Sequence, residues 1–161
     1  MKLRTLLLLA LAVLPVLACQ SEVREANINQ DKYIDNYITA TFGDTATVFR
    51  NGGSSRVVLV EGPAGAPVIE RGDSVYLYYA GHTFTQRGPE IQFVLDSGMV
   101  LVGSGKLIKG LENGLPGARL GEEAIILFSA DDGYGNQAVG LVPENTALLF
   151  HVGVALIKKN P

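Results

Sequence analysis

Alternating apolar and polar residues predict strands over much of the chain. In residues 75–79, Val75, Leu77 and Tyr79 fall on one side of a strand, because successive side chains point to opposite faces. Three further stretches are predicted as strands from their apolar and β-branched content: 91–95, 123–129 and 147–157. Strands outnumber helices, and no alternation of single strands with long helices appears. The pattern therefore predicts an α+β domain built on an antiparallel sheet.

Two helices and one hairpin complete the predicted elements. In residues 31–38, apolar side chains recur every three to four positions, which predicts a short helix. A second helix is predicted over residues 106–115, directly before a Pro-Gly pair. The dipeptide Asn51-Gly52 separates two β-branched runs, 46–50 and 56–61. Asn and Gly both tolerate positive φ, so this arrangement predicts a β-hairpin.

The most apolar segment of the chain lies at its beginning. Lys2 and Arg4 precede an almost unbroken apolar run from residue 6 to residue 17. A helix needs about 20 residues to cross a bilayer, so this run is too short to span one. A basic start, a short apolar stretch and small residues at its end are typical of a secretory signal peptide. We therefore assign residues 1–18 to a signal peptide.

The end of this segment resembles the lipobox of bacterial lipoproteins. The four residues are Val16-Leu17-Ala18-Cys19, and Cys19 is the only cysteine in the chain. The resemblance implies cleavage before Cys19, lipidation of that residue and a lipid anchor in the bacterial cell envelope. Residues 19–30 are then a polar tether, and Gln20 after the cysteine favours the outer membrane over the inner membrane. An ordinary signal peptide followed by a bystander cysteine remains the alternative.

Charge and composition exclude several classes of site. The chain carries 13 Lys and Arg against 16 Asp and Glu, and loss of the signal peptide removes two of the basic residues. A broadly basic surface for nucleic acid is therefore not expected. A single cysteine excludes an intramolecular disulfide and a cysteine-based metal cluster. Asp131 and Asp132 precede Gly-Tyr-Gly and fit a turn better than a metal site, so no metal is expected there. His82 and His151 are far apart in the sequence and are expected to be structural or exposed and not to act as catalytic bases.

What remains is a set of apolar and aromatic residues that would suit a hydrophobic binding pocket with one or two hydroxyls. Its members lie between residues 79 and 150: Tyr79, Phe93, Leu107, Ile108, Leu111, Tyr134, Leu141 and Phe150.

Several of these residues occur in motifs that resemble FKBP-type peptidyl-prolyl cis-trans isomerases. Five segments match the family pattern in the right order: GDSVYLYYAG (72–81), VGSGKLIKGLENGL (102–115), GARLGE (117–122), GYG (133–135) and LVP (141–143), followed by a final strand, ALLF (147–150). The resemblance covers residues 72–157.

The resemblance implies a fold, an activity and a set of site residues. The family fold is an antiparallel sheet of five or six strands curled around a short helix. We therefore assign residues 72–161 to an FKBP-like domain and residues 31–71 to an extension that holds the N-terminal helix and the hairpin. The implied activity is cis-trans isomerisation of X-Pro bonds by a membrane-tethered folding factor, and it requires no metal or cofactor. The implied substrates are proline-containing segments of exported proteins. The implied catalytic residues are Tyr79, Tyr134 and Phe150, and the implied substrate-binding residues are Phe93, Leu107, Ile108, Leu111 and Leu141. The oligomeric state is left open.

Two departures from the family pattern keep a second hypothesis open. Leu111 stands where the family usually has Trp, and no Asp follows Phe93. A non-catalytic peptide-binding or chaperone lipoprotein with the same fold is therefore the alternative. An open cavity would favour catalysis if it is bounded by Tyr79, Leu111, Tyr134 and Phe150. A cavity filled by residues 82–101 would favour the alternative.

Overall fold

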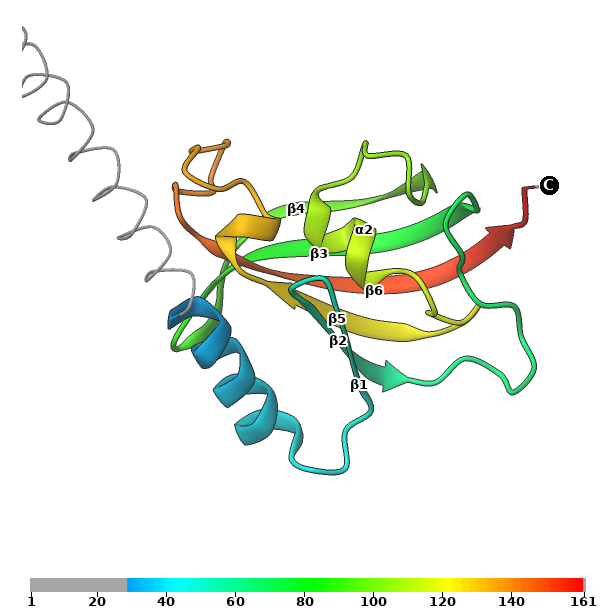
Figure 1. Cartoon of the computed structure of the whole chain (residues 1–161), viewed down its shortest axis with the longest axis horizontal. Coiled ribbons are helices and arrows are strands. Elements are labelled where there is room, and N and C mark those ends of the chain that lie inside the picture. The colour runs from blue at the N-terminus through cyan, green and yellow to red at the C-terminus, as the bar shows by residue number, and fades with distance from the viewer. Residues whose placement is uncertain (1–28, 161) are drawn as a thin grey trace, which may run out of the picture.

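The computed structural model describes residues 29–160, which form a six-stranded antiparallel sheet with helices on both faces (Figure 1). The strand order is β1-β2-β5-β6-β3-β4. The bounds are Val48–Asn51 (β1), Ser54–Val60 (β2), Ser74–Thr85 (β3), Gly88–Leu101 (β4), Glu123–Phe128 (β5) and Ala147–Lys158 (β6). Helix α2 spans Lys109–Gly114, the 3-10 helix η1 spans Ala130–Asp132, and an N-terminal helix is described from residue 29 to residue 42.

The sheet buries a separate hydrophobic cluster on each face. On one face, Leu111 and Leu115 of the α2 region pack with Phe128 and Phe150. On the opposite face, the N-terminal helix inserts Ile34 and Ile38 among residues that alternate with the first set along the strands, namely Phe84, Ile125, Leu127 and Leu149. Figure 1 shows the two helices on opposite sides of the sheet. The prediction of an α+β antiparallel fold is confirmed.

Strands β3 and β4 form a hairpin that is much longer than predicted. We expected a strand over residues 91–95, whereas β4 has 14 residues and pairs with β3 along its length. The polar and glycine residues Ser97 and Gly98 interrupt the alternation, and apolar residues occupy the exposed side, where Leu95 is 73% exposed. Neither feature is typical of a half-buried strand, so periodicity identified only the middle of β4.

The hairpin at residues 46–61 is part of the same sheet. Its turn lies at Gly52 and Gly53, both at positive φ, and β2 pairs with β5. A buried ion pair between Arg56 of β2 and Glu122 reinforces this pairing. The hairpin that we assigned to an extension thus contributes two strands to the sheet that the FKBP-like segment forms.

The N-terminal helix is longer than predicted. It covers residues 29–42 instead of 31–38, and Asn29 and Gln30, which we assigned to the tether, are helical. Gln30 is 6% exposed, so its assignment to a solvated tether is wrong. The signal peptide, Cys19 and the rest of the tether lie outside the described residues. Among residues 29–160, no helix has both the length and the apolar character of a membrane-spanning segment.

Candidate active site

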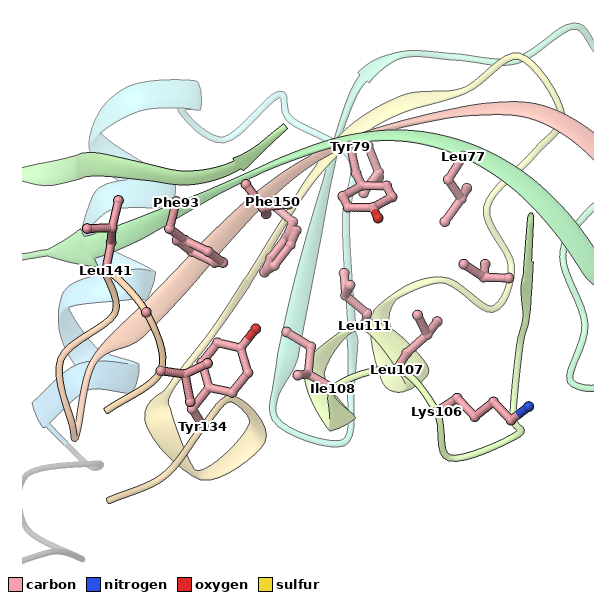
Figure 2. A pocket seen from close by; sticks show the side chains of 15 residues that line it. Leu77, Tyr79, Phe93, Lys106, Leu107, Ile108, Leu111, Tyr134, Leu141 and Phe150 are labelled. Carbon is pink, nitrogen blue, oxygen red and sulfur yellow. The ribbon is translucent and has the colours of Figure 1, made fainter. Parts of the chain in front are cut away.

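A cavity of about 430 Å³ lies between α2, the sheet and the loop that joins η1 to β6 (Figure 2). All eight residues singled out from the sequence line it: Tyr79, Phe93, Leu107, Ile108, Leu111, Tyr134, Leu141 and Phe150. They come from strands β3, β4 and β6, from α2 and the turn before it, and from the η1–β6 loop. Residues 82–101 form the end of β3, the turn after it and β4, and they line one side of the cavity through Phe93, Val94 and Val100 without filling it.

Aromatic rings form one wall of the cavity. The Phe93 ring meets Phe150 edge-on, with centroids 5.7 Å apart, and meets Tyr134 edge-on at 6.4 Å. Phe150 in turn stacks on Phe128 at 5.9 Å with an interplanar angle of 11°. These distances are within the range at which aromatic pairs attract each other beyond their area burial. The rings therefore support one another, which gives the cavity a preformed wall.

Helix α2 and the turn before it form the side of the cavity opposite the aromatic wall. We predicted a helix over residues 106–115, but α2 begins only at Lys109. The carboxylate of Glu112, a buried residue of α2, accepts hydrogen bonds from the backbone N–H groups of Gly103, Gly105 (2.8 Å) and Leu107 (3.4 Å). Because these N–H groups converge on one carboxylate, residues 103–107 wrap around it as a loop and do not extend the helix.

Two glycines let α2 lie directly on the sheet. A Cβ atom on Gly110 would lie 2.2 Å from the Phe128 ring, and one on Gly114 would lie 2.5 Å from Ile126. The Gly110 carbonyl also accepts a hydrogen bond from the Ser54 hydroxyl at 2.8 Å, which joins the helix to β2. The close approach brings Leu111 into the cavity from α2, with Ile108 immediately before the helix.

Two tyrosine hydroxyls point into the cavity (Figure 2). Burial raises the pKa of Tyr134 above its ordinary value. Burial also raises the pKa of Tyr79, with a further contribution from the negative charge of Asp96, which faces Tyr79 across the β3–β4 pairing. Both phenols are therefore neutral at physiological pH and can donate a hydrogen bond. A third donor is the backbone N–H of Ile108, the N-cap of α2, since N–H groups at a helix start have no partner within the helix.

Sequence reasoning missed several lining residues. Leu77 shares the inward face of β3 with Tyr79, so the strand alternation contained the signal for it. Val139 and Gly140 lie in an irregular loop, where no periodicity could identify them. Lys106 is the charged residue of the lining, at the edge beside Leu107. The remaining missed residues are Val94, Val100 and Val152.

The two histidines lie together but do not line this cavity. Their rings meet edge-on with centroids 5.9 Å apart on β3 and β6, and burial, assisted by His82, lowers the pKa of His151. Within residues 29–160, no three His, Cys, Asp or Glu side chains are grouped as metal ligands. The cavity is suited to holding an apolar ring and donating hydrogen bonds to a carbonyl group, and its lining contains no carboxylate or imidazole.

Residues 66–155 match the family model of the FKBP-type peptidyl-prolyl cis-trans isomerases. This segment is more than half of the chain. The chain belongs to the FKBP family. This is a family of peptidyl-prolyl cis-trans isomerases, which agrees with the activity that the sequence motifs implied.

Named relatives support the assignment. The FKBP chain is 30% identical over 111 residues to FK506-binding protein 1 of Aspergillus oryzae, which covers 62% of this chain and 94% of that protein. It is 37% identical over 90 residues to a peptidyl-prolyl cis-trans isomerase of Schizosaccharomyces pombe, covering 53% of this chain and 79% of the relative. Among solved structures, the three FKBP domains of wheat FKBP73 match with a TM-score of 0.62 at 20% identity, covering 71% of this chain and 52% of that one. The predicted FKBP-like fold is thereby confirmed.

Proposed function

We propose that this FKBP is a membrane-tethered isomerase that acts on X-Pro bonds of exported proteins. The observation that carries the catalytic part is the open apolar cavity, into which two neutral tyrosine hydroxyls point (Figure 2). The part of the proposal that concerns membrane and substrates rests on the sequence of the first 19 residues.

The cavity supports isomerisation by a physical route that needs no nucleophile. Rotation about an X-Pro bond is opposed by a barrier of about 20 kcal/mol, because twisting the amide removes its resonance. The twisted amide has less charge separation than the planar amide, so transfer from water to an apolar cavity favours the twisted form. In this proposal Leu111 and Phe150 hold the proline ring. The Tyr134 hydroxyl and the Ile108 N–H then donate hydrogen bonds to the bound peptide.

A kinetic assay tests the catalytic role. Protein lacking residues 1–20 is mixed with a short X-Pro peptide, and the cis-to-trans rate is followed as protein is added. We expect the rate to rise in proportion to protein concentration. In Tyr134→Phe, kcat/KM should fall about three- to tenfold, as expected for the loss of one neutral hydrogen bond.

Tyr78→Phe is the matched control, because Tyr78 is 59% exposed and does not line the cavity. It should leave the rate unchanged. A wild-type protein that binds the peptide but leaves the uncatalysed rate unchanged would contradict the enzyme and favour the peptide-binding alternative.

The tether is tested separately in a bacterial host that processes lipoproteins. The sequence contains a basic start, a short apolar run and Cys19 after Ala18. Because two or three acyl chains anchor a protein stably, the full chain should sediment with membranes, most of it with the outer membrane. Cys19→Ala should release the protein into the soluble fraction, whereas Gln20→Ala should leave it attached. Continued membrane association of Cys19→Ala would contradict the lipid anchor.

A further inference from the structure

The N-terminal helix, which precedes the segment matched by the family model, contacts the loop that carries the cavity tyrosine. This loop runs from Ala130 to residue 146 and includes Tyr134 and Leu141 of the cavity lining. The first described turn of the helix lies at the same end of the sheet (Figure 1). The contact is made by Gln30, a side chain that is 6% exposed.

Gln30 binds both ends of the loop at once. Its Nε2 donates a hydrogen bond to the Asn145 carbonyl at 2.7 Å, and its Oε1 accepts one from the Ala130 N–H at 2.7 Å. These two partners are 15 positions apart in the sequence. A buried amide that satisfies a donor and an acceptor from two separate strand ends holds them at a fixed separation.

Hydrogen bonds link the two partners of Gln30 to the residues on either side of Tyr134. The Ala130 carbonyl accepts hydrogen bonds from Gly133 (3.0 Å) and Gly135 (2.8 Å), the residues on either side of Tyr134. The Gly135 carbonyl in turn accepts a hydrogen bond from the Asn145 N–H at 2.7 Å. Asn145 has a φ of 53°, a left-handed conformation that residues other than glycine adopt uncommonly and that asparagine tolerates best. One short network therefore joins Gln30 to the backbone that positions the Tyr134 hydroxyl.

We propose that Gln30 is a positioning residue, through which the N-terminal helix fixes the 130–146 loop and the Tyr134 hydroxyl. The expected effect of Gln30 on catalysis rests on the proposed isomerase activity. The expected effect of Gln30 on the loop does not depend on that activity. The helix itself is held on the sheet by Ile34 and Ile38, so loss of the Gln30 amide should loosen the loop without detaching the helix.

Amide hydrogen exchange tests the structural part without reference to activity. In Gln30→Ala, the Asn145 and Gly135 amides should exchange at least about tenfold faster than in the wild type, because the network loses its anchor. The Val152 amide in the centre of β6 should exchange at an unchanged rate. Asn36→Ala, at an exposed position of the same helix, is the control and should change none of the three. Unchanged exchange at Asn145 and Gly135 in Gln30→Ala would overturn the proposal.

Kinetics and a pH profile test the positioning role. We expect Gln30→Ala to lower kcat about tenfold, because small displacements of a positioned group are costly. KM should change less than about twofold, because Phe93 and Phe150 lie on β4 and β6 and not on the loosened loop. In Gln30→Glu, the ionised carboxylate can accept from Ala130 but cannot donate to Asn145. Protonation restores the donor, so activity should recover towards the wild-type value as the pH is lowered from 8 to 5, while burial raises the pKa of the new carboxyl above about 4.3.

The pH dependence of kcat is also measured for the wild type and for Asn36→Ala. These two profiles correct for protonation of the other carboxyls at this end of the molecule, Asp31, Asp131 and Asp132. Equal losses of kcat at every pH in Gln30→Glu would overturn the positioning role. A wild type without isomerase activity would instead contradict the proposed function and leave amide exchange to decide the role of Gln30.

Discussion

Gly81 shows how one residue determines the shape of the cavity. Gly81 ends the sequence motif at residues 72–81 and lies on β3, two residues after Tyr79. A Cβ atom there would lie 2.7 Å from both Phe150 and Val94 and 2.8 Å from Phe93. The aromatic wall therefore occupies the space that any other side chain would need, so the glycine is required for packing and not for an unusual φ.

Replacement of Gly81 by alanine should displace this wall. We expect Gly81→Ala to destabilise the fold by about 1–3 kcal/mol through overpacking and to lower kcat/KM, as measured by urea unfolding and the X-Pro assay. Gly98→Ala on β4 is the matched control, because its Cβ would meet nothing within 4 Å. That variant should stay within about 0.5 kcal/mol of the wild type. Equal effects at the two glycines would contradict the packing argument.

Helix α2 has six residues and depends on contacts beyond its own backbone hydrogen bonds. Isolated helices of this length are not stable in water. The Glu112 carboxylate compensates by accepting N–H groups from the 103–107 loop, and Lys109 forms an ion pair with Asp132 of η1. The helix and the loop before it thus behave as one unit beside the cavity.

Glu112→Gln should weaken the attachment of the 103–107 loop to α2. A glutamine offers one acceptor oxygen, and its NH₂ group would face N–H donors, so we expect a loss of about 1–3 kcal/mol in the free energy of unfolding. Gly103 and Gly105 should show faster amide exchange by NMR. Glu123→Gln, at an exposed position of β5, should change neither quantity. Unaltered exchange at both glycines would show that the carboxylate does not hold the loop.

Strand β2 is attached to the sheet by a buried ion pair. The side chains of Arg56 and Glu122 are 2% and 7% exposed, and the Phe49 ring lies 4.5 Å from the Arg56 guanidinium carbon. Glu122 also accepts the Arg119 N–H at 3.0 Å. A buried pair contributes little net stability, but removal of one partner leaves an unpaired buried charge.

The single and double variants should therefore differ in a characteristic way. Arg56→Met and Glu122→Leu should each lower the free energy of unfolding by about 3–5 kcal/mol, and the double variant should lose less than the sum. Denaturant unfolding measures all three. Additive losses would show that the two charges do not depend on each other. Arg50→Met is a control, because its ion pair with Asp35 is exposed on both sides.

At the scale of the whole molecule, the C-terminal end closes onto the segment before β3. Lys159 forms ion pairs with Asp73 at 2.9 Å and Glu70 at 2.7 Å, and Asp73 also accepts the Glu70 N–H at 2.7 Å. The Glu70 N–H, followed by Lys159, holds the pKa of Asp73 below its ordinary value. The folded state therefore keeps Asp73 ionised at a pH at which the unfolded chain protonates it.

This difference predicts the direction of acid sensitivity. The contribution of Asp73 to stability is fully present above about pH 4, the pKa of an unfolded aspartate, and is lost as the pH falls through the lowered folded value. Asp73→Asn should be less stable than the wild type near pH 7, and the difference should shrink towards pH 2 in thermal unfolding. Asp44→Asn, in an exposed turn, should follow the wild-type curve. A stability difference for Asp73→Asn that does not change with pH would contradict the linkage.

How much of this molecule was predictable depends on the kind of signal each residue gives. Leu77 and Tyr79 obey strand alternation, and the motif around Leu107, Ile108 and Leu111 is a local pattern, so the sheet and most cavity residues were accessible. Gln30 and Glu112 were not, since a buried polar side chain with a distant partner looks like a surface residue in sequence. For that reason the predicted helix began at residue 106 although α2 begins at Lys109, and the predicted N-terminal helix left out Asn29 and Gln30.

The leucine on α2 also has a spectroscopic consequence. The chain has no tryptophan, and Leu111 lies in the cavity lining where the family usually has one. Leu111→Trp would therefore place a single indole fluorophore against the bound proline ring, free of background from other tryptophans. Its emission would shift to shorter wavelength when a peptide excludes water from the cavity, so occupancy could be read optically and independently of turnover.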